Sequence, residues 1–281
     1  MSATALSIIK VILFVALFVT KFGLGLSVAP GDLRFFRERR GLMVRSILAV
    51  IFLVPIAYVL LILLFRPDPA MAVAIALLAA SPAAPFAFSK VGKSGGSLAY
   101  AATLQFVVAM LSIVTTPLVL RLIGMTLGFE TTIHPFKVAW QVFIAQFLPI
   151  GLGVLVRAKF SGLARLARPF VKVATFIFLA FLLFIIVMQY RGFVQTSLMS
   201  YILIVCTTAV ALALGHLLAP REPGMQTALA LETAMRNPGL ALLIAAMNFP
   251  QAKPLPILLP CVVVSTLLAT LYTLVMNRKK A

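Results

Sequence analysis

The sequence contains little cysteine, little histidine and few acidic residues, and each shortage excludes a class of protein. Its 281 residues include 2 Cys, 2 His and 6 Asp or Glu, against 24 Lys or Arg. Cys206 and Cys261 stand alone inside apolar runs, so the sequence has neither the spacing of a cysteine metal site nor a disulfide framework. We expect both to be small buried hydrophobic residues.

Charged residues as a whole are scarce. They make up 11% of the chain, whereas a soluble globular domain has about 25%. Hydrophobic residues make up 63%, and mostly apolar runs of about 18 residues or more recur along the whole length. These features exclude a soluble globule and predict an all-α polytopic membrane protein, with residues 1–281 forming one transmembrane domain in a lipid bilayer.

The charges that are present are mostly positive and follow the apolar runs. A net charge of +18 would favour nucleic-acid binding in a soluble protein, but here the basic residues cluster in short loops, so we predict no nucleic-acid partner. The loops after the first, third, fifth and seventh apolar spans, with the C-terminus, carry most of the Lys and Arg. The positive-inside rule then predicts an outside N-terminus and a cytoplasmic C-terminus. We expect the protein in a bacterial inner (plasma) membrane.

Nine apolar spans account for most of the chain. The first could imitate a signal peptide, but it is longer than a signal h-region and no basic segment precedes it, so we interpret it as a membrane helix. The predicted spans are residues 5–28, 42–65, 69–89, 97–125, 137–157, 169–190, 198–219, 223–248 and 254–276.

The eighth span is the most informative because polar residues interrupt its middle. These residues are Glu232, Arg236, Asn237, Pro238 and Gly239. A charge at membrane depth costs about 2.5 to 3.5 kcal/mol on insertion scales. Pro238 has no N–H, and it disfavours helical geometry at Asn237. Since non-helical backbone at membrane depth survives only where protein buries it or water lines it, we predict a broken helix around a binding site.

A second break lies in the third span, where Pro82 and Pro85 interrupt the apolar run. Pairing spans one to four with six to nine aligns the two breaks and makes the second copy run in the opposite direction. We therefore predict two inverted repeats, the first over about 5–125 and the second over about 169–276, joined by a linking helix over about 137–157. The alternative is coincidence, because prolines are common in membrane helices.

Four segments resemble, in the same order, the bile acid:sodium symporter superfamily. Residues 231–241, Leu-Glu-Thr-Ala-Met-Arg-Asn-Pro-Gly-Leu-Ala, are similar to its Glu-Thr-Gly-x-Gln-Asn-x-x-Leu segment. Residues 22–34 resemble its Met-Gly-Leu-x-x-x-x-x-Asp-Phe signature, and residues 52–57 its Gln-Phe-x-x-Met-Pro-x-x-Ala. Residues 81–84, Ser-Pro-Ala-Ala, stand where the family has Cys-Pro-Gly-Gly. The resemblance implies two broken helices that cross in a core domain beside a panel domain.

The resemblance also implies secondary transport of organic anions, usually coupled to sodium. Of the family's sodium ligands, the acid falls on Glu232, the Asn on Asn237 and one Thr on Thr103. The other ligand positions hold residues without a side-chain oxygen: Val50, Ala87, Phe88, Ala99 and Arg236. Glu232, Asn237 and Thr103 are therefore ligands only if sodium is bound, and we predict no complete metal site.

Arg236 suggests a different counter-charge. A guanidinium offers only donors and cannot coordinate a cation. Arg236 follows Glu232 by one helical turn, so the two can pair if that turn stays helical. We hypothesise that Arg236 replaces sodium as the fixed counter-charge to Glu232, which leaves proton-coupled or uncoupled transport. A purely structural ion pair is the alternative.

We predict a secondary transporter that moves a small organic anion by alternating access and has no other cofactor. Its site should lie between residues 81–89 and 232–239, where half-helix N-termini suit a carboxylate. Its candidate substrate- or ion-binding side chains are Glu232, Arg236, Asn237 and Thr103, and its helix-break backbone residues are Pro82, Pro85, Pro238 and Gly239. Lys90 could attract the anion or snorkel to the interface.

Two other classes of protein compete with this prediction. With one Glu and no His well inside the spans, the chain lacks the catalytic pairs of an intramembrane enzyme, so we predict that it is not one. A membrane scaffold or sensor that transports nothing remains an alternative. The substrate's identity, the direction of transport and the oligomeric state do not follow from the sequence.

Overall fold

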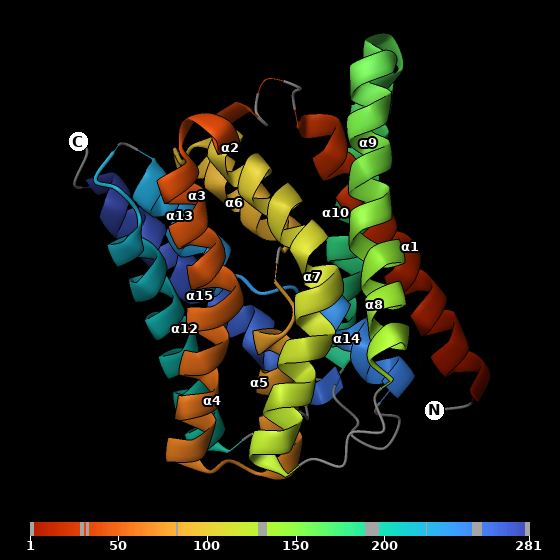
Figure 1. Ribbon diagram of the computed structural model, residues 1–281. Coiled ribbons are helices and arrows are strands. Elements are labelled where there is room, and N and C mark those ends of the chain that lie inside the picture. Colours follow the sequence, from red (N-terminus) through yellow and green to blue (C-terminus); the bar gives the residue numbers. More distant parts are fainter. Residues whose placement is uncertain are drawn as a thin grey trace.

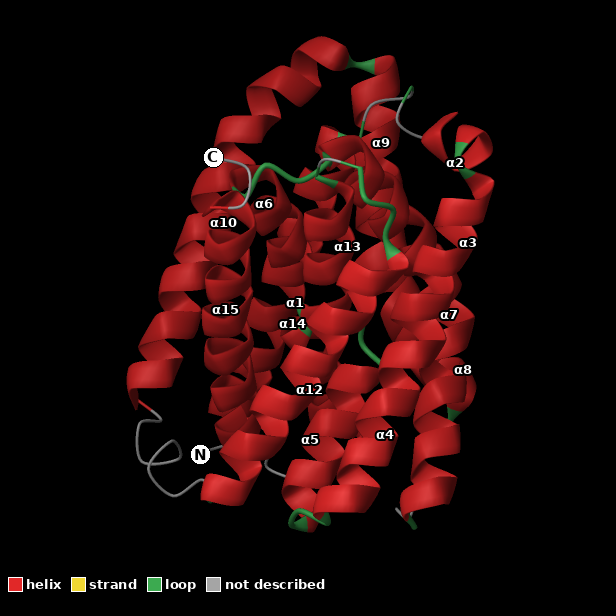
Figure 2. Ribbon diagram, turned by 90° about the vertical axis from the view of Figure 1, so that its left-hand side faces the viewer, coloured by secondary structure: helices red, strands yellow, loops and turns green. Residues whose placement is uncertain are grey.

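Helices form all the regular structure in the described part of the chain. The computed structural model describes residues 3–28, 31, 34–82, 84–128, 134–188, 197–222, 224–248 and 255–278. Its helices are α1 (Ala3–Ser27), α2 (Arg34–Glu38), α3 (Arg40–Leu48), η1 (Ala49–Leu53), α4 (Val54–Phe65), α5 (Pro69–Ala79), α6 (Pro85–Lys93), α7 (Leu98–Leu127), α8 (Pro135–Val142), η2 (Phe143–Phe147), α9 (Leu148–Lys159), α10 (Ser161–Met188), α12 (Leu198–Leu218), α13 (Met225–Ala234), α14 (Pro238–Asn248) and α15 (Leu255–Arg278). Figure 2 shows helices and loops in these residues, and no strand.

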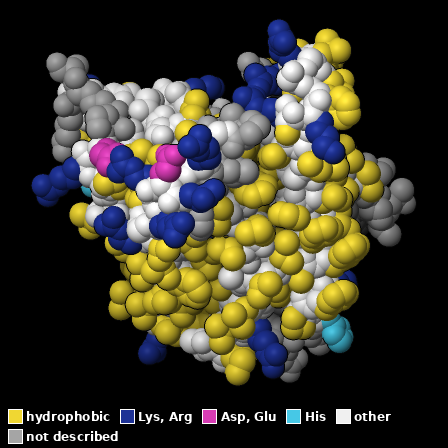
Figure 3. Space-filling view, turned by 45° about the horizontal axis from the view of Figure 1, so that its top comes forward, with side chains coloured by type: hydrophobic (Ala, Val, Ile, Leu, Met, Phe, Trp, Pro, Cys, Tyr) yellow, Lys and Arg dark blue, Asp and Glu magenta, His cyan; other side chains and the backbone are white. Residues whose placement is uncertain are grey.

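The helices carry the apolar outer surface of a membrane protein. Among the described residues, five helices are long and apolar enough to cross a bilayer: Arg40–Phe65, Leu98–Leu127, Pro135–Lys159, Leu198–Leu218 and Leu258–Arg278. Large apolar side chains face outward along them, and Figure 3 shows such side chains covering much of one face below a region rich in Lys and Arg. The prediction of an all-α polytopic membrane protein is confirmed, and each predicted span coincides with one helix or with consecutive helices.

Two of the long helices contain a π-helical turn directly before a proline. The turn η1 precedes Pro55 and η2 precedes Pro149. A proline ring clashes with the carbonyl four residues earlier and supplies no N–H, and a wider turn relieves the clash without ending the helix. As a result, α3–η1–α4 and α8–η2–α9 each form one long continuous helix.

The two predicted breaks are present, and they meet. The first separates α5 from α6 and the second separates α13 from α14. Pro85 and Pro238 are the first residues of α6 and α14, where a missing N–H costs nothing. The backbone N–H of Asn237 donates to the carbonyl of Ser81 at 2.8 Å, which joins the breaks. In Figure 1, α6 and α13 lie in the upper half of the molecule, and α5 and α14 lie in the lower half.

Small residues bring the helices close together. A Cβ atom on Gly25 of α1 would lie 2.2 Å from the Ile150 carbonyl oxygen, and one on Gly153 of α9 would lie 2.3 Å from the Phe22 carbonyl oxygen. Helix α1 packs on α9 and α10, whereas α12 packs on α13, α4 and α15. These two sets of helices occupy the right-hand and left-hand sides of Figure 1. Whether they move as panel and core, and whether the halves are inverted repeats, stays a prediction.

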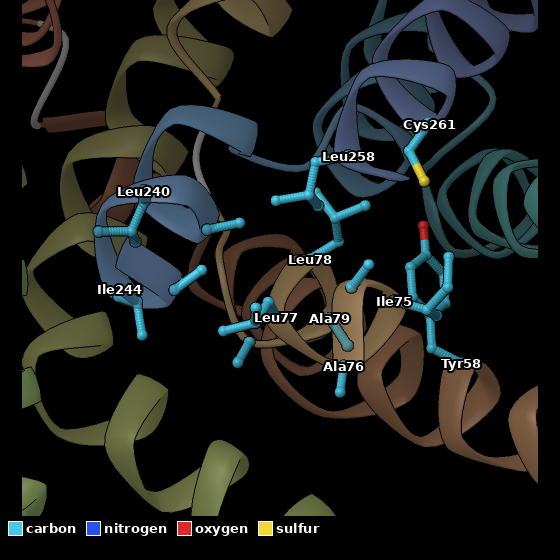
Figure 4. Packing of buried hydrophobic residues seen from close by; sticks show 14 of the residues in the cluster. Tyr58, Ile75, Ala76, Leu77, Leu78, Ala79, Leu240, Ile244, Leu258 and Cys261 are labelled. Carbon is cyan, nitrogen blue, oxygen red and sulfur yellow. The ribbon is translucent and has the colours of Figure 1, made fainter. Parts of the chain in front are cut away.

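Buried apolar residues fill the space below the breaks. Leu77, Leu240 and Ile244 belong to this cluster, as do Tyr58 and Cys261, and Figure 4 shows the Tyr58 hydroxyl pointing toward the Cys261 sulfur. Cys261 is buried, as predicted, whereas Cys206 is only partly buried.

Candidate functional site

The predicted site residues gather at the place where the two broken helices meet. Glu232, Arg236 and Asn237 are 2%, 6% and 1% exposed, although they carry charge or an amide. Pro82 and Pro85 flank the first break, and Pro238 and Gly239 begin α14 after the second. The structure therefore brings the residues of both breaks together, as the sequence predicted.

Asn237 organises the second break. Its side-chain Oδ1 accepts a hydrogen bond from the Leu240 N–H at 3.1 Å, so it caps the start of α14. Its Nδ2 donates to Gln146 Oε1 of η2 at 3.2 Å. A Cβ atom on Gly239 would lie 2.8 Å from a methyl of Leu17, so a larger residue there would require the Leu17 side chain to shift. Asn237 therefore ties the break to η2, while α1 packs directly against the start of α14.

Arg236 binds backbone carbonyls at the end of α5, one of which, that of Leu78, also accepts from the Ser81 N–H at 3.0 Å. Its Nε donates to the Leu78 carbonyl at 3.1 Å, and its Nη2 donates to the Ala79 carbonyl. Both carbonyls belong to the last turn of α5, where helical partners run out and the helix dipole is negative. The guanidinium is therefore the C-terminal cap of the first half-helix.

Pro55 leaves a backbone carbonyl available for the third hydrogen bond of Arg236. The Val54 N–H bonds to the Ala49 carbonyl, five residues back, so the next carbonyl in that pattern, that of Val50, would need the N–H of residue 55. Pro55 has none. Arg236 Nη1 donates to the Val50 carbonyl at 3.0 Å instead. One side chain thus holds the end of α5 against the π-turn η1.

The hypothesis that Arg236 pairs with Glu232 is wrong. Helix α13 ends at Ala234, and Met235 leaves helical geometry with φ −85° and ψ 84°. The one-turn spacing is lost, and the guanidinium turns to α5. Among the described residues, the salt bridges are Arg34–Glu38 and Arg39–Glu222, and neither Glu232 nor Arg236 takes part in one.

Glu232 faces an amide and an ammonium that are absent from the predicted site residues. Gln105 Nε2 of α7 lies 2.9 Å from each carboxylate oxygen of Glu232 and also donates to the Ala84 carbonyl at 2.7 Å. Lys21 of α1 is 0% exposed, and its charge interacts with that of Glu232. Lys21 was detectable from the sequence, since an ionisable residue inside a span is a functional candidate by default.

Thr103 is the candidate with the weakest structural connection to the breaks. It is fully buried in α7, and its hydroxyl donates to the Ala99 carbonyl at 2.8 Å, one turn earlier in the same helix. Gln105 bonds to Glu232 from the same helix. The role of Thr103 stays a prediction.

A cavity of about 470 Å³ opens beside the breaks. Its basic lining residues are Arg236, Lys90 and Lys93, and no Asp or Glu is among its described lining residues. Most of the remaining wall is apolar and comes from α4, α5, α6, α12 and α15, with Pro238 at the start of α14. Its size lies within the range of small-molecule sites, roughly 300–1,000 Å³. Glu232, Asn237 and Thr103 lie outside this lining.

The basic groups line different parts of this cavity. Lys90 and Lys93 belong to the last turn of α6, and Lys90 Nζ donates to Thr270 Oγ1 of α15 at 2.6 Å. Arg236 lines it at the break, beside the first residue of α14. A ligand there would meet apolar walls, positive side chains and the N-terminal ends of two half-helices. This chemistry suits an anion with an apolar body.

Comparison with known protein families gives a match. The sequence model described as the sodium bile acid symporter family matches residues 14–197, which is more than half of the chain. The matched region includes the first break and ends before α13. No curated protein matches the chain.

Proposed function

Because the chain belongs to the sodium bile acid symporter family, whose members are transporters, we propose that it is a secondary transporter of a small organic anion. The observation that carries this proposal is the cavity of about 470 Å³ beside the breaks, with Arg236, Lys90 and Lys93 in its wall and no described acidic side chain. An anion with an apolar body gains both electrostatic attraction and burial there. Guanidinium binds carboxylates well, so Arg236 is the side chain best suited to the anionic end.

Alternating access is the proposed mechanism. The set α1, α9 and α10 and the set around α12, α13 and α15 would move relative to one another as panel and core, and the joined breaks would keep the site intact during the movement. Inverted repeats would give the two end states similar energies, because each half can adopt the conformation of the other. We place the N-terminus outside and the C-terminus in the cytoplasm of a bacterial inner membrane, since the loop distribution of Lys and Arg supports that orientation.

The coupling ion is part of the proposal. Gln105 Nε2 donates to Glu232, the charge of Lys21 interacts with it, and Arg236 is engaged with backbone carbonyls, which supports transport that is proton-coupled or uncoupled rather than sodium-coupled.

Uptake into proteoliposomes tests the proposal. Labelled monocarboxylates and steroid-like anions would be offered with a sodium gradient, a proton gradient and neither. We expect uptake of at least one anion class, and we expect Ser265→Trp, which fills the cavity wall on α15, to reduce that uptake at least tenfold. Leu271→Trp is the matched control, because Leu271 lies outside the cavity lining on the same helix and is 58% exposed. Equal uptake by both variants, or no uptake of any anion by the parent, contradicts the proposal.

A further inference from the structure

Two electronegative groups are buried at the crossing, and each requires compensation. One is the Glu232 carboxylate, and the other is the group of carbonyls at the end of α5. An isolated charge at this depth is expensive, and helix-end carbonyls without donors are also costly. In a transporter such places can bind the coupling cation, because unwound carbonyls and half-helix C-termini coordinate cations well. Here the chain supplies donors to both.

Lys21 reaches the crossing from outside the set of helices that carries Glu232. Leu17 contacts the start of α14 at Gly239, and Lys21 follows Leu17 by one turn on the same face of α1. Helix α1 also packs on α6 and α7, which carry Ala84 and Gln105 beside Glu232. Lys21 is fully buried in this packing, and its charge interacts with that of Glu232.

The groups around Glu232 and Arg236 do not fit sodium. A sodium ion needs oxygen acceptors, whereas a guanidinium and an ammonium offer only donors. Both oxygens of Glu232 lie 2.9 Å from the Gln105 amide nitrogen, and the carbonyls of Leu78 and Val50 accept from Arg236. Two buried side-chain oxygens at the breaks, Gln105 Oε1 and Ser81 Oγ, have no hydrogen-bond partner in the described residues. Two uncharged oxygens are too few to form a sodium site.

We propose that Lys21 is a tethered counter-cation for Glu232, and that Lys21 and Arg236 together replace bound metal cations at the crossing of the broken helices. Gln105 is a positioning residue, because it orients the carboxylate and ties it to the first break through Ala84. The inference rests on the proposed function only where it concerns the ion that is coupled to transport. With these two side chains in place, the crossing of the broken helices folds without bound sodium.

A double-mutant cycle on thermal stability tests this inference without a substrate. The parent, Lys21→Met, Glu232→Gln and the double variant would be melted in sodium, potassium and choline chloride at one ionic strength. We expect each single variant to lose several degrees in melting temperature, because it leaves one buried charge uncompensated. The double variant should recover most of that loss, and the parent should melt at the same temperature in all three salts.

A matched cycle serves as the control. Arg39→Met and Glu222→Gln break an exposed pair with an N···O distance of 2.7 Å, so their effects should be small and only weakly coupled. If a single variant at Lys21 or Glu232 fails to fold, the double variant must still fold. Additive losses at Lys21 and Glu232, failure of the double variant, or a sodium-specific rise in the parent's melting temperature would overturn the inference. If the protein takes up no anion but the stability effects of Lys21→Met and Glu232→Gln are coupled, the proposed function is wrong and this inference still holds.

Discussion

The Arg236 side chain shows how one residue can take the place of several missing backbone donors. Its three hydrogen bonds reach Leu78, Ala79 and Val50, from the end of α5 and from the turn that Pro55 widens. Helical donors run out at all three positions, because Leu78 and Ala79 lie in the last turn of α5 and Val50 lies in the π-turn before Pro55; the Leu78 carbonyl also accepts from the Ser81 N–H. The guanidinium suits this role because its donors form a fixed planar fork.

Replacing the Arg236 guanidinium should lower the stability of the protein. We expect Arg236→Gln to reduce the free energy of unfolding by more than about 2 kcal/mol, since each carbonyl left buried without a donor costs about 1–3 kcal/mol. Anion uptake should also fall, because Arg236 lines the cavity. Denaturation followed by tryptophan fluorescence or thermal melting measures the first effect. Arg34→Gln is the control, since the Arg34 side chain is 78% exposed and should change stability little. Equal stability losses in the two variants would show that the carbonyl bonds of Arg236 contribute nothing.

At the scale of helices, the contact of α1 with α9 depends on glycines that leave no room for a side chain. Gly25 and Gly153 face each other, and a Cβ on either would meet backbone atoms of the partner helix within 2.9 Å. Backbone cannot turn away as a flexible side chain can, so the helices would have to separate. Because α1 carries Lys21, a shift of α1 would also move the ammonium.

The helix contact gives a prediction with an internal control. Gly153→Ala should destabilise the protein by about 1–3 kcal/mol, as expected for overpacking, although alanine is the better helix former. Gly151 lies in the same helix, and a Cβ atom added there would meet no neighbouring atom within 4 Å, so Gly151→Ala should be neutral or stabilising by up to about 1 kcal/mol. Melting temperatures of the two variants check this. A Gly151→Ala variant as unstable as Gly153→Ala would mean that glycine flexibility, not the close approach, is what α9 requires.

At the scale of the whole molecule, the charge distribution predicts the orientation in the membrane. Thr126 lies at the end of α7 on the side with few basic loops, and Ser161 lies at the start of α10 on the basic side. In intact cells, a membrane-impermeant maleimide should label Thr126→Cys and not Ser161→Cys, with the reverse in inside-out vesicles. The parent is the control, because Cys206 and Cys261 lie inside helices. Labelling of Ser161→Cys in intact cells would mean that the orientation is inverted.

The sequence by itself determined the helices, the breaks and the residues that are costly to bury. These properties are local: hydropathy sets the spans, and proline removes an N–H wherever it stands. The positions of Pro85, Pro238 and Glu232 therefore predicted where the two broken helices would meet. The resemblance to the family also came from the sequence, because the order of motifs along the chain is a property of the sequence, and the family match over residues 14–197 confirms it.

Only the tertiary structure decided which groups compensate each buried charge. A one-turn spacing between Glu232 and Arg236 predicted a pair, but α13 ends between them, and the direction of a side chain after a helix end depends on what surrounds it. The partners of Arg236 are carbonyls far away in sequence, the hydrogen-bond donor to Glu232 is Gln105 of α7, and its proposed counter-charge is Lys21 of α1. Contacts between helices depend on how those helices pack, and no local pattern encodes that packing.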